Sequence, residues 1–442
     1  MFITSYDILH IDLSQPLEAI EHQARPIYVL LWWQTVPLGQ VVLLPEDLPM
    51  SAAAFANIAA AHIRPAVKAY LDPQTLDARG GVRISTDLSA ALDRLVVQPA
   101  LPAEKSAPSV SVVVCTRDRP EQLVDCLRSL AALTSPADEI IVVDNAPRTL
   151  ETRKVVEQFE AGQFEAEQFA VKQSEVEQSE VEPLKKVRYV LEPQPGLSRA
   201  RNTGIAHARS DIVAFTDDDV CVHPGWLQPI RAAFQNEKVM AATGIVLPTT
   251  LASETQVLFE LSYGYLNHGY KPRIYDETFL DHPQRKGIHV WEIGAGANMA
   301  FRREVFDRVG LFDLRLGAGA SGCSEDSEMW YRILASGGYC QYVPAAVVYH
   351  THRPDAASFK QQMRAYMRGH VVALLIQFAQ FKHPGNLRRL FVEIPYFFWH
   401  HLKPAIRHRF RNRYQSYGSE LLGYLSGIPT YLKLTYGSKV RF

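Results

Sequence analysis

Three adjacent carboxylates, Asp217, Asp218 and Asp219, directly follow an apolar segment of the chain, DIVAFT. Like charges at the end of a buried strand repel one another, so the arrangement is costly unless a cation neutralises it. Mg2+ and Mn2+ prefer carboxylate oxygens and keep coordination positions open for substrate phosphates. The triplet therefore predicts a divalent metal site that bridges a diphosphate and eases its departure. A solvated acidic turn, or the start of a helix, is the structural alternative.

A second acidic pair, Glu325 and Asp326, lies in SEDSEMWYR, just after the glycine-rich run GAGASG. Acidic residues in the first turn of a helix are stabilised by the helix dipole, and this is the purely structural interpretation. A carboxylate at a helix start beside a movable glycine loop also suits a general base.

The segments around these residues alternate between strand and helix patterns. Strands are expected in VSVVVCT, EIIVVDNA, VRYVLEP and DIVAFTDDD, and helices in PEQLVDCLRSLAAL and RARNTGIAHA. The first two strand segments are continuous apolar runs, as in parallel strands that are covered on both faces. We therefore expect a doubly wound α/β sheet, with ligand-binding loops at the carboxyl ends of its strands.

The chain resembles family 2 glycosyltransferases of the GT-A fold. Six segments occur in the order typical of that family: SVVVCTRDRP, IIVVDNA, GLSRARNTGIAHARSDIVAFTDDDV, PGWL, GAGANMAFRREVFDRVGLFD and SEDSEMWYRILASGGY. The resemblance implies a mixed sheet with a Rossmann-like nucleotide-binding half and an acceptor half. It also implies metal-dependent, inverting transfer of a sugar from a nucleotide sugar, by family habit a UDP-sugar, to a hydroxyl of a glycan or lipid-linked acceptor. The Gln-x-x-Arg-Trp motif of processive relatives does not follow SEDSEMW, which favours single additions.

The resemblance also assigns roles, position by position. It places these residues around the nucleotide sugar: Thr116, Arg117, Asp118, Asp144, Gly196, Arg199, Asn202, Asp217 and Asp218. It places Trp291, Gly296 and Asn298 on the sugar and acceptor side. It makes Asp326 the general base, with Glu325 beside it. It assigns the metal, Mn2+ or Mg2+, to Asp217, Asp219 and His350, with His352 as a rival ligand. Arg201 is an alternative to Arg199 as a fixed positive charge near the pyrophosphate.

The rest of the chain forms two further predicted parts. Residues 1–106 are expected to be a small α+β accessory unit with a strand pair, a hairpin (YVLLWWQ and QVVLL) and an Ala-rich helix, before a linker, PALPAEKSAPS. The glycosyltransferase domain is expected at 107–354, and a helical extension at 355–442. A five-residue repeat at 157–182 has no core face at a helical period, which indicates a solvent-exposed insertion.

The predicted extension carries an excess of Lys and Arg interleaved with Phe, Trp and Tyr. This composition is typical of helices in a membrane interface, so an anionic membrane surface is a candidate partner. No nucleic-acid recognition motif accompanies the charge, and nucleic acid is not an expected partner. The five cysteines form no Cys-x-x-Cys pair, and no signal sequence or apolar span is evident. These features favour a cytoplasmic protein, with peripheral attachment to the inner face of the cell membrane as a hypothesis.

Two other functional classes remain open from the sequence. A nucleotidyltransferase also joins a doubly wound sheet to carboxylate-bound metal, but CTRDRP lacks the glycines of its phosphate loop. A catalytically silent protein could hold a nucleotide sugar or a polysaccharide, although the joint presence of Asp217, Asp219 and Asp326 argues against this. The donor sugar, the acceptor and the oligomeric state are not determined by these patterns.

Overall fold

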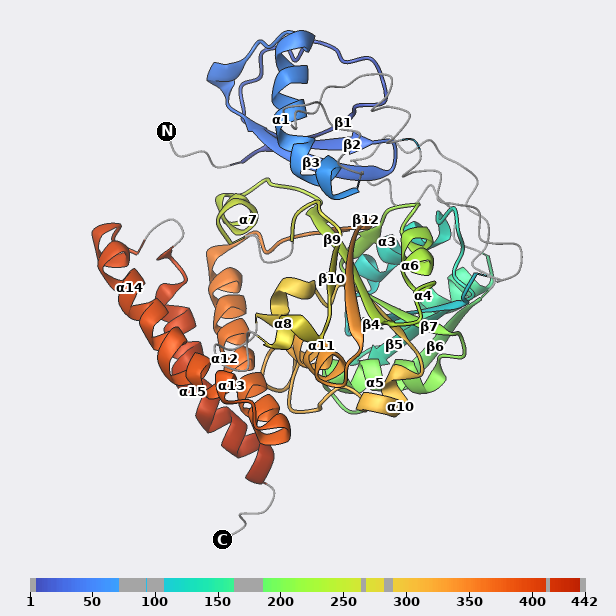
Figure 1. The fold of residues 1–442 in the computed structure, drawn as a ribbon. Coiled ribbons are helices and arrows are strands. Elements are labelled where there is room, and N and C mark those ends of the chain that lie inside the picture. Colours follow the sequence, from blue (N-terminus) through green and yellow to red (C-terminus); the bar gives the residue numbers. More distant parts are fainter. Residues whose placement is uncertain are drawn as a thin grey trace.

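The computed structural model describes residues 5–70, 93, 107–162, 186–263, 268–281, 289–410 and 414–437 (Figure 1). It has three parts: a small N-terminal sheet with one helix, a large mixed sheet with helices on both faces, and a set of C-terminal helices. Most of the predicted repeat, and residues 99–106 of the predicted linker, lie outside the described residues.

The N-terminal part consists of β1 (Asp7–Asp12), β2 (Ile27–Trp33), β3 (Val36–Leu43) and α1 (Ala52–Tyr70). The antiparallel pairing of β2 with β3 confirms the predicted hairpin. The predicted strand pair before the hairpin is wrong for the described residues, because a single strand, β1, lies there and pairs parallel to β2. A short 3-10 turn, η1 (Pro45–Asp47), leads into α1.

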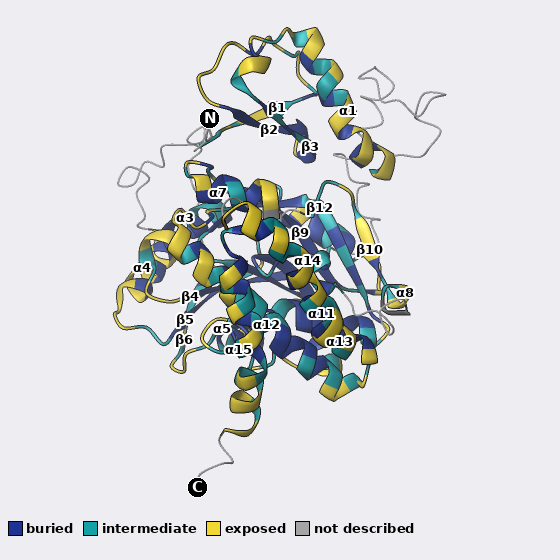
Figure 2. Cartoon of the chain, turned by 90° about the vertical axis from the view of Figure 1, so that its left-hand side faces the viewer, coloured by how far each residue is buried: buried dark blue, intermediate teal, exposed yellow. Residues whose placement is uncertain are grey.

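Strand β2 is buried on both faces, and its residues alternate between two cores. Val29, Leu31 and Trp33 pack in the core of the N-terminal part, which includes residues of α1. Tyr28, Leu30 and Trp32 pack in the core of the large sheet. Successive side chains of a strand point to opposite faces, so β2 contributes to both cores and thereby joins the N-terminal part to the large sheet. Figures 1 and 2 both show it covering one end of that sheet.

The large sheet has the strand order β10-β12-β9-β11-β7-β4-β5-β6, with β8 paired to β12. Its strands are β4 (Val110–Thr116), β5 (Glu139–Asn145), β6 (Val187–Glu192), β7 (Ile212–Asp217), β8 (Val220–Val222), β9 (Val239–Pro248), β10 (Arg273–Tyr275), β11 (Asn298–Arg302) and β12 (Tyr339–His350). Strands β4 to β7 run parallel, whereas β11 is antiparallel to β7 and β9. This confirms the predicted mixed sheet with a doubly wound half.

Two cores sandwich the sheet because apolar side chains emerge from both faces of the central strands. Its helices are α3 (Pro120–Ala131), α4 (Glu151–Glu160), α5 (Leu197–His207), α6 (Leu227–Ala233), α7 (Glu254–Leu258), α8 (Glu277–Asp281), α10 (Val305–Val309) and α11 (Glu325–Ala335). Helices α3, α4 and α6 cover one face, and α5 and α11 the other. Helix α5 approaches β4 closely at Gly204, where a Cβ atom would lie 2.4 Å from a methyl group of Val113. This packing fixes the start of α5 at the carboxyl end of the sheet.

The C-terminal helices are α12 (Ala356–Phe381), α13 (Pro384–Arg388), α14 (Ile394–Arg407) and α15 (Tyr417–Tyr436). Their presence confirms the predicted helical extension. Asp355 caps α12, because its carboxylate accepts hydrogen bonds from the N–H groups of Ala357 and Ser358. A π-helical turn, η6 (Arg389–Glu393), joins α13 to α14. Among the described residues, no helix is both long and apolar enough to cross a membrane.

Candidate active site

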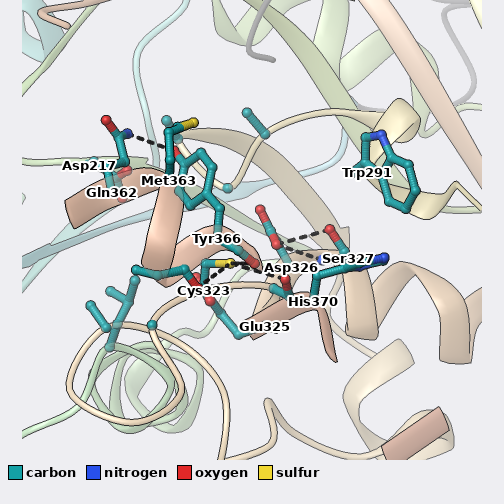
Figure 3. A pocket seen from close by; sticks show the side chains of 18 of the residues that line it. Asp217, Trp291, Cys323, Glu325, Asp326, Ser327, Gln362, Met363, Tyr366 and His370 are labelled. Atoms are coloured by element: carbon teal, nitrogen blue, oxygen red, sulfur yellow. Dashed lines mark hydrogen bonds between the residues drawn. The ribbon is translucent and has the colours of Figure 1, made fainter. Parts of the chain in front are cut away.

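A pocket of about 1100 Å³ lies at the carboxyl ends of β4, β5 and β7 and extends to the C-terminal helices (Figure 3). Its wall brings together these predicted residues: Thr116, Arg117, Gly196, Asp217, Asp218, Asp219, Trp291, Gly296, Glu325, Asp326 and His350. The other predicted residues do not line it: Asp118, Asp144, Arg199, Asn202 and Asn298. The acidic triplet and the Glu-Asp pair therefore meet in one cavity, although more than a hundred positions separate them in the chain.

The three aspartates turn in different directions where β7 ends. Asp218 is 4% exposed and faces the protein, where it accepts hydrogen bonds from Thr116 Oγ1 (2.7 Å) and Arg119 Nη1 (3.1 Å). Burial raises the pKa of Asp218 to about 6, against the opposing effect of Arg119. Asp217 and Asp219 are more open to the pocket, with side chains 33% and 17% exposed. Thus the outer two acids are better placed to meet a ligand than the middle one.

Arg201 lies between the two acidic groups. Its Nη1 donates to Glu325 Oε1 (2.5 Å), and its Nη2 lies 3.4 Å from Asp217 Oδ1 and 3.3 Å from the carbonyl oxygen of Gly296. The side chain is only 3% exposed. Arg201, rather than Arg199, is therefore the cation at the centre of the site. The signal was available in the sequence, because Ser198, Arg201 and Ile205 share the buried face of α5 at helical spacing.

Glu325 and Asp326 begin α11 but have different surroundings. Glu325 is buried against Arg201, and its Oε2 has no hydrogen-bond partner among the described residues. Burial raises the pKa of Glu325, whereas Arg201 opposes the shift. The Oδ1 atom of Asp326 accepts a hydrogen bond from the Ser327 N–H (2.7 Å). Its Oδ2 borders Gly296, where a Cβ atom would lie 2.9 Å away, so the absence of a side chain at Gly296 leaves room beside Asp326.

A chain of buried polar groups leads from the N-terminal sheet to Asp219. The Tyr28 hydroxyl lies 2.8 Å from Glu260 Oε1, and Glu260 Oε2 lies 3.1 Å from His352 Nε2. His352 Nδ1 lies 3.2 Å from His350 Nδ1, and His350 Nε2 lies 3.7 Å from Asp219 Oδ1. His352, the rival metal ligand, therefore faces Glu260 and not the aspartates.

This chain assigns the proton positions on the two histidines. With a single proton on the His352 ring, Nε2 donates to Glu260 and Nδ1 is an acceptor, so His350 donates from its own Nδ1. Burial lowers the pKa of His350, which keeps its ring neutral and leaves a lone pair on Nε2. A lone pair opposite the Asp219 carboxylate is unfavourable alone, but suits two ligands of one cation.

The residues present therefore fit a divalent ion that is only partly enclosed by protein. Among the described residues, no three His, Cys, Asp or Glu side chains converge closely enough to hold an ion by themselves. Mg2+ is commonly held by one or two protein ligands plus substrate phosphates and water. Asp219 and His350 supply such a pair, and Asp217 lines the same pocket.

The nucleotide-side residues divide into pocket wall and support. Asn145 lies at the carboxyl end of β5, where ligand-binding loops are expected. It accepts a hydrogen bond from the Gly196 N–H (2.8 Å) and donates one to the Gln194 carbonyl (2.7 Å), so it fixes the turn before α5. Asp118 faces away, where its carboxylate accepts from the Arg148 N–H (2.8 Å). Asn145 lies within the family-like segment IIVVDNA, but its contact with this turn joins residues about 50 positions apart and cannot be read from the local sequence.

Asp144 is fully buried at the end of β5. Its Oδ2 accepts a hydrogen bond from the Tyr189 hydroxyl (3.0 Å), while Oδ1 has no partner among the described residues. Burial raises the pKa of Asp144 to about 6. An unpaired oxygen on a buried carboxylate calls for a donor, and a ligand N–H would supply one.

Two residues predicted to contact the substrates, Asn202 and Asn298, form hydrogen bonds within the protein instead. Asn202 bonds to both the N–H and the carbonyl of Phe312, at 2.9 Å each. Asn298 is fully buried and accepts from Trp226 Nε1 (2.8 Å) while donating to the Ile245 and Ala346 carbonyls. Both asparagines hold parts of the pocket wall in place without lining it.

The C-terminal helices supply a part of the wall that no motif predicted. The residues concerned include Met363, Tyr366, His370, Arg389, Ile394 and Phe397. These residues lie outside the six family-like segments, so only the folded structure identifies them as part of the pocket wall.

Comparisons with known proteins find glycosyltransferases. The model of "Glycosyl transferase family 2" matches residues 111–310, and that of "Glycosyl transferase family group 2" matches residues 212–425. Glycosyltransferase AglE of Haloferax volcanii is 24% identical over 260 residues, which cover 58% of this chain and 71% of that protein. The pre-mycofactocin glycosyltransferase of Mycobacterium tuberculosis is 24% identical over 197 residues, which cover 45% of this chain and 37% of that protein.

A third relative is the glucosyl-dolichyl phosphate glucuronosyltransferase of Haloferax volcanii, 26% identical over 214 residues, which cover 47% of this chain and 57% of that protein. The chain thus spans between 37% and 71% of the lengths of these three relatives. Among solved structures, the mannosyltransferase PcManGT from Pyrobaculum calidifontis, in complex with GDP-Man and Mn2+, superposes with a TM-score of 0.46 and 17% identity, covering 76% of this chain and 92% of that one.

The mixed sheet and the cavity at its carboxyl edge have the arrangement that the sequence resemblance to GT-A glycosyltransferases implies. The two family models together match residues 111–425, and with the curated relatives they identify this region as a family 2 glycosyltransferase domain. The comparisons thereby favour this class over the nucleotidyltransferase and the silent binding protein.

The substitution Asp144→Asn should flatten the pH dependence of stability. The pKa of Asp144, about 6, exceeds its ordinary value of 3.8, so folding favours the protonated carboxyl. That contribution is fully present below about pH 4 and is lost as the pH rises through about 6. Urea unfolding should therefore show the wild type losing stability relative to the variant across this window. The exposed carboxylate variant Asp307→Asn should keep the wild-type slope, and equal slopes for wild type and Asp144→Asn would contradict the assignment.

Proposed function

We propose that this glycosyltransferase transfers one sugar per encounter, with inversion, from a nucleotide sugar to a hydroxyl of a glycan or lipid-linked acceptor. The nucleotide is UDP by family habit. The observation that carries the proposal is the pairing of an open carboxylate, Asp326, with a buried one, Glu325, that Arg201 neutralises. Two neighbouring carboxyl groups with different partners can perform different tasks in one site.

In the proposed reaction, Asp326 takes the proton from the acceptor hydroxyl. The acceptor oxygen forms a bond to the anomeric carbon on the side opposite the leaving nucleoside diphosphate, and the bond from that carbon to the phosphate oxygen breaks. The Ser327 N–H holds one oxygen of Asp326, which leaves the other directed past Gly296. Arg201 holds Glu325 and Asp217 together, so the acceptor side and the diphosphate side keep a fixed relation.

Asp219 and His350, with Asp217 nearby, are the residues that would hold Mn2+ or Mg2+. When bound, such an ion supplies charge neutralisation for the departing diphosphate. Asp218 and Arg119 support the turn that carries Asp219, since Arg119 Nη1 contacts both acids at 3.1 and 3.2 Å. The Thr116 hydroxyl binds Asp218 as well, which ties this turn to the first loop.

A membrane surface is the further proposed partner, and two exposed apolar stripes support it. On η6 and α14, Val392, Tyr396, Trp399 and Ile406 recur at intervals of three, four or seven residues and are 55–76% exposed. On α15, Leu422, Leu425, Leu432 and Tyr436 recur in the same way and are 49–60% exposed. Exposed basic residues accompany these stripes: Arg388, Lys403, Arg407 and Lys433. Apolar stripes flanked by cations match an interfacial helix on anionic lipid, and Figure 2 shows exposed residues along both helices.

Asp326→Asn should abolish most turnover without weakening donor binding. The amide cannot accept the acceptor proton, so kcat should fall about 100- to 10,000-fold. The affinity for UDP, measured by calorimetry with Mn2+, should stay within about threefold of the wild type, because the diphosphate is proposed to bind near Asp217 and Asp219. Asp307→Asn should behave as the wild type. A variant at Asp326 that keeps more than about a tenth of kcat would assign the base elsewhere.

Metal affinity should depend on the buried chain as well as on the ligands themselves. In a Mn2+ titration with UDP present, Asp219→Asn should lose binding by at least about 100-fold, and Glu260→Gln by about 10- to 100-fold, because outer partners orient a metal-binding His. A Gln amide can donate to His352 Nε2, which would place the proton of His350 on its Nε2. Glu254→Gln, an exposed change in α7 six residues before Glu260, is the matched control. Unchanged Mn2+ affinity in Asp219→Asn would rule out the proposed site.

Membrane attachment should require both apolar stripes. In flotation with vesicles of phosphatidylglycerol and phosphatidylcholine, we expect full-length protein to float, and to float less as salt rises. The double variant Trp399→Ser, Leu425→Ser should lower the partition at least about tenfold, since each side chain contributes more than 1 kcal/mol when buried. Leu311→Ser, an exposed apolar change elsewhere, should have no effect. Wild-type protein that stays unbound with anionic vesicles would exclude this partner.

A further inference from the structure

The pocket has a second end, formed around Arg389, that the proposed chemistry does not use. The Arg389 guanidinium lies over the ring of Trp291, 4.3 Å from its centroid. Trp291 also stacks on His289 and meets the edge of His370. The Arg389 side chain is 15% exposed, so it is largely desolvated yet reaches the pocket surface.

The hydrogen bonds of Arg389 leave one edge of the guanidinium unused. Its Nε donates to His370 Nε2 (3.1 Å), and its Nη1 lies 2.6 Å from His289 Nε2 and 3.1 Å from Glu393 Oε2. Among the described residues, Nη2 has no protein acceptor. A guanidinium presents five N–H donors in a fixed plane, so the two N–H groups of Nη2 remain for a ligand.

The groups facing Arg389 do not fully balance its charge. Burial lowers the pKa of both His370 and His289, so these rings are neutral acceptors. Glu393 is shared with Arg388 at 3.5 Å, and Glu292 faces the far side of His289 at 3.1 Å. The unused edge of Arg389 is therefore cationic and is not covered by a carboxylate, which suits an anionic group with several acceptor oxygens.

An irregular turn of the backbone carries this guanidinium. Arg389 and Glu393 begin and end the π-helical turn η6, the one interruption of the helical path from Pro384 to Arg407. Such turns are uncommon and frequently occur at functional sites. In Figure 3, Trp291 and Asp217 lie at opposite ends of the pocket with Asp326 between them. A group bound at Arg389 would therefore lie on the acceptor side of the base.

An apolar path leads from this end to the surface. Ile394 and Phe397, on the first turn of α14, line the pocket next to Arg389. Phe397 is 41% exposed and lies between Tyr396 and Trp399, both strongly exposed. The pocket wall thus passes from the Arg389 edge, past Glu393, which pairs with Arg389 Nη1, to the apolar surface of Ile394 and Phe397.

We infer that the Arg389 end of the pocket binds the phosphate of a lipid-phosphate-linked acceptor, whose apolar chain leaves past Ile394 and Phe397. This inference rests on the proposed function and names its acceptor class. Trp291 and the two histidines hold the guanidinium flat, and Nη2 presents its donors to phosphate oxygens in the fork geometry that arginine offers.

The test compares two small amphiphiles with the same chain in the full-length Trp399→Ser, Leu425→Ser protein, in which surface partition is reduced. Octyl phosphate and octyl β-glucoside, both below their micellar concentrations, are titrated calorimetrically alongside inorganic phosphate. We expect octyl phosphate to bind about 10- to 100-fold tighter than either of the other two, because it alone offers both an anion and a chain. Arg389→Gln should remove this preference, whereas Arg388→Gln, a change at the neighbouring half-exposed arginine, should keep it.

Each result decides the inference. A preference that survives in Arg389→Gln, or a loss of octyl glucoside binding equal to that of octyl phosphate, would overturn the phosphate assignment. Inorganic phosphate that binds as tightly as octyl phosphate would overturn the lipid assignment. UDP binding in the presence of Mn2+ should be the same in Arg389→Gln and in its parent. Absence of UDP binding in both would count against the proposed function alone, since the amphiphile titrations use no nucleotide.

Discussion

The ion pairs of Arg201 are the interaction on which the rest of the site depends. One buried guanidinium contacts Asp217 at the end of β7 and Glu325 at the start of α11, so it joins the two halves of the large sheet. Removal of one partner from such a buried set typically costs about 3–5 kcal/mol, because a charge is left without compensation. The same contact also has a chemical consequence. With Glu325 occupied by Arg201, Asp326 is the carboxylate of the pair that remains open to the pocket.

The N-terminal sheet is connected to this centre through a second buried network. Tyr28, on the side of β2 that faces the large sheet, contacts Glu260, which lies on the π-helical turn η4 (Phe259–Tyr263). Glu260 fixes His352, and His352 fixes His350 beside Asp219. A part of the chain that carries none of the family motifs thus contacts the network that sets the proton positions of His350. This gives the accessory unit a positioning role, and it explains why β2 must be buried on both faces.

The sequence predicted the large sheet well because its strands are continuous apolar runs and its helices have one apolar stripe, and both patterns are local. It also located Asp217, Asp219, Glu325, Asp326 and His350, since each lies at the end or start of such an element. It could not resolve which of several neighbours turns inward: Asp218 faces Thr116, and Arg201 replaces Arg199 at the centre. The direction of a side chain depends on partners about a hundred positions away, as with Asn202 and Phe312. The expected strand pair before the hairpin failed for a similar reason, because β1 finds its partner in β2.

The two ends of the pocket carry opposite charges, and each has a polar group with a position open to a ligand. At the nucleotide end, an excess of carboxylates is held together by Arg119 and Arg201, and a cation can enter between Asp219 and His350. At the other end, the cation Arg389 is already in place, flanked by neutral histidines and an aromatic face, and an anion can enter. In both cases a largely buried polar group keeps one binding position without a protein partner. This costs stability, and a ligand of opposite charge can offset the cost. The C-terminal helices thereby contribute to the same pocket as the large sheet, because Arg389, Ile394 and Phe397 line its second end.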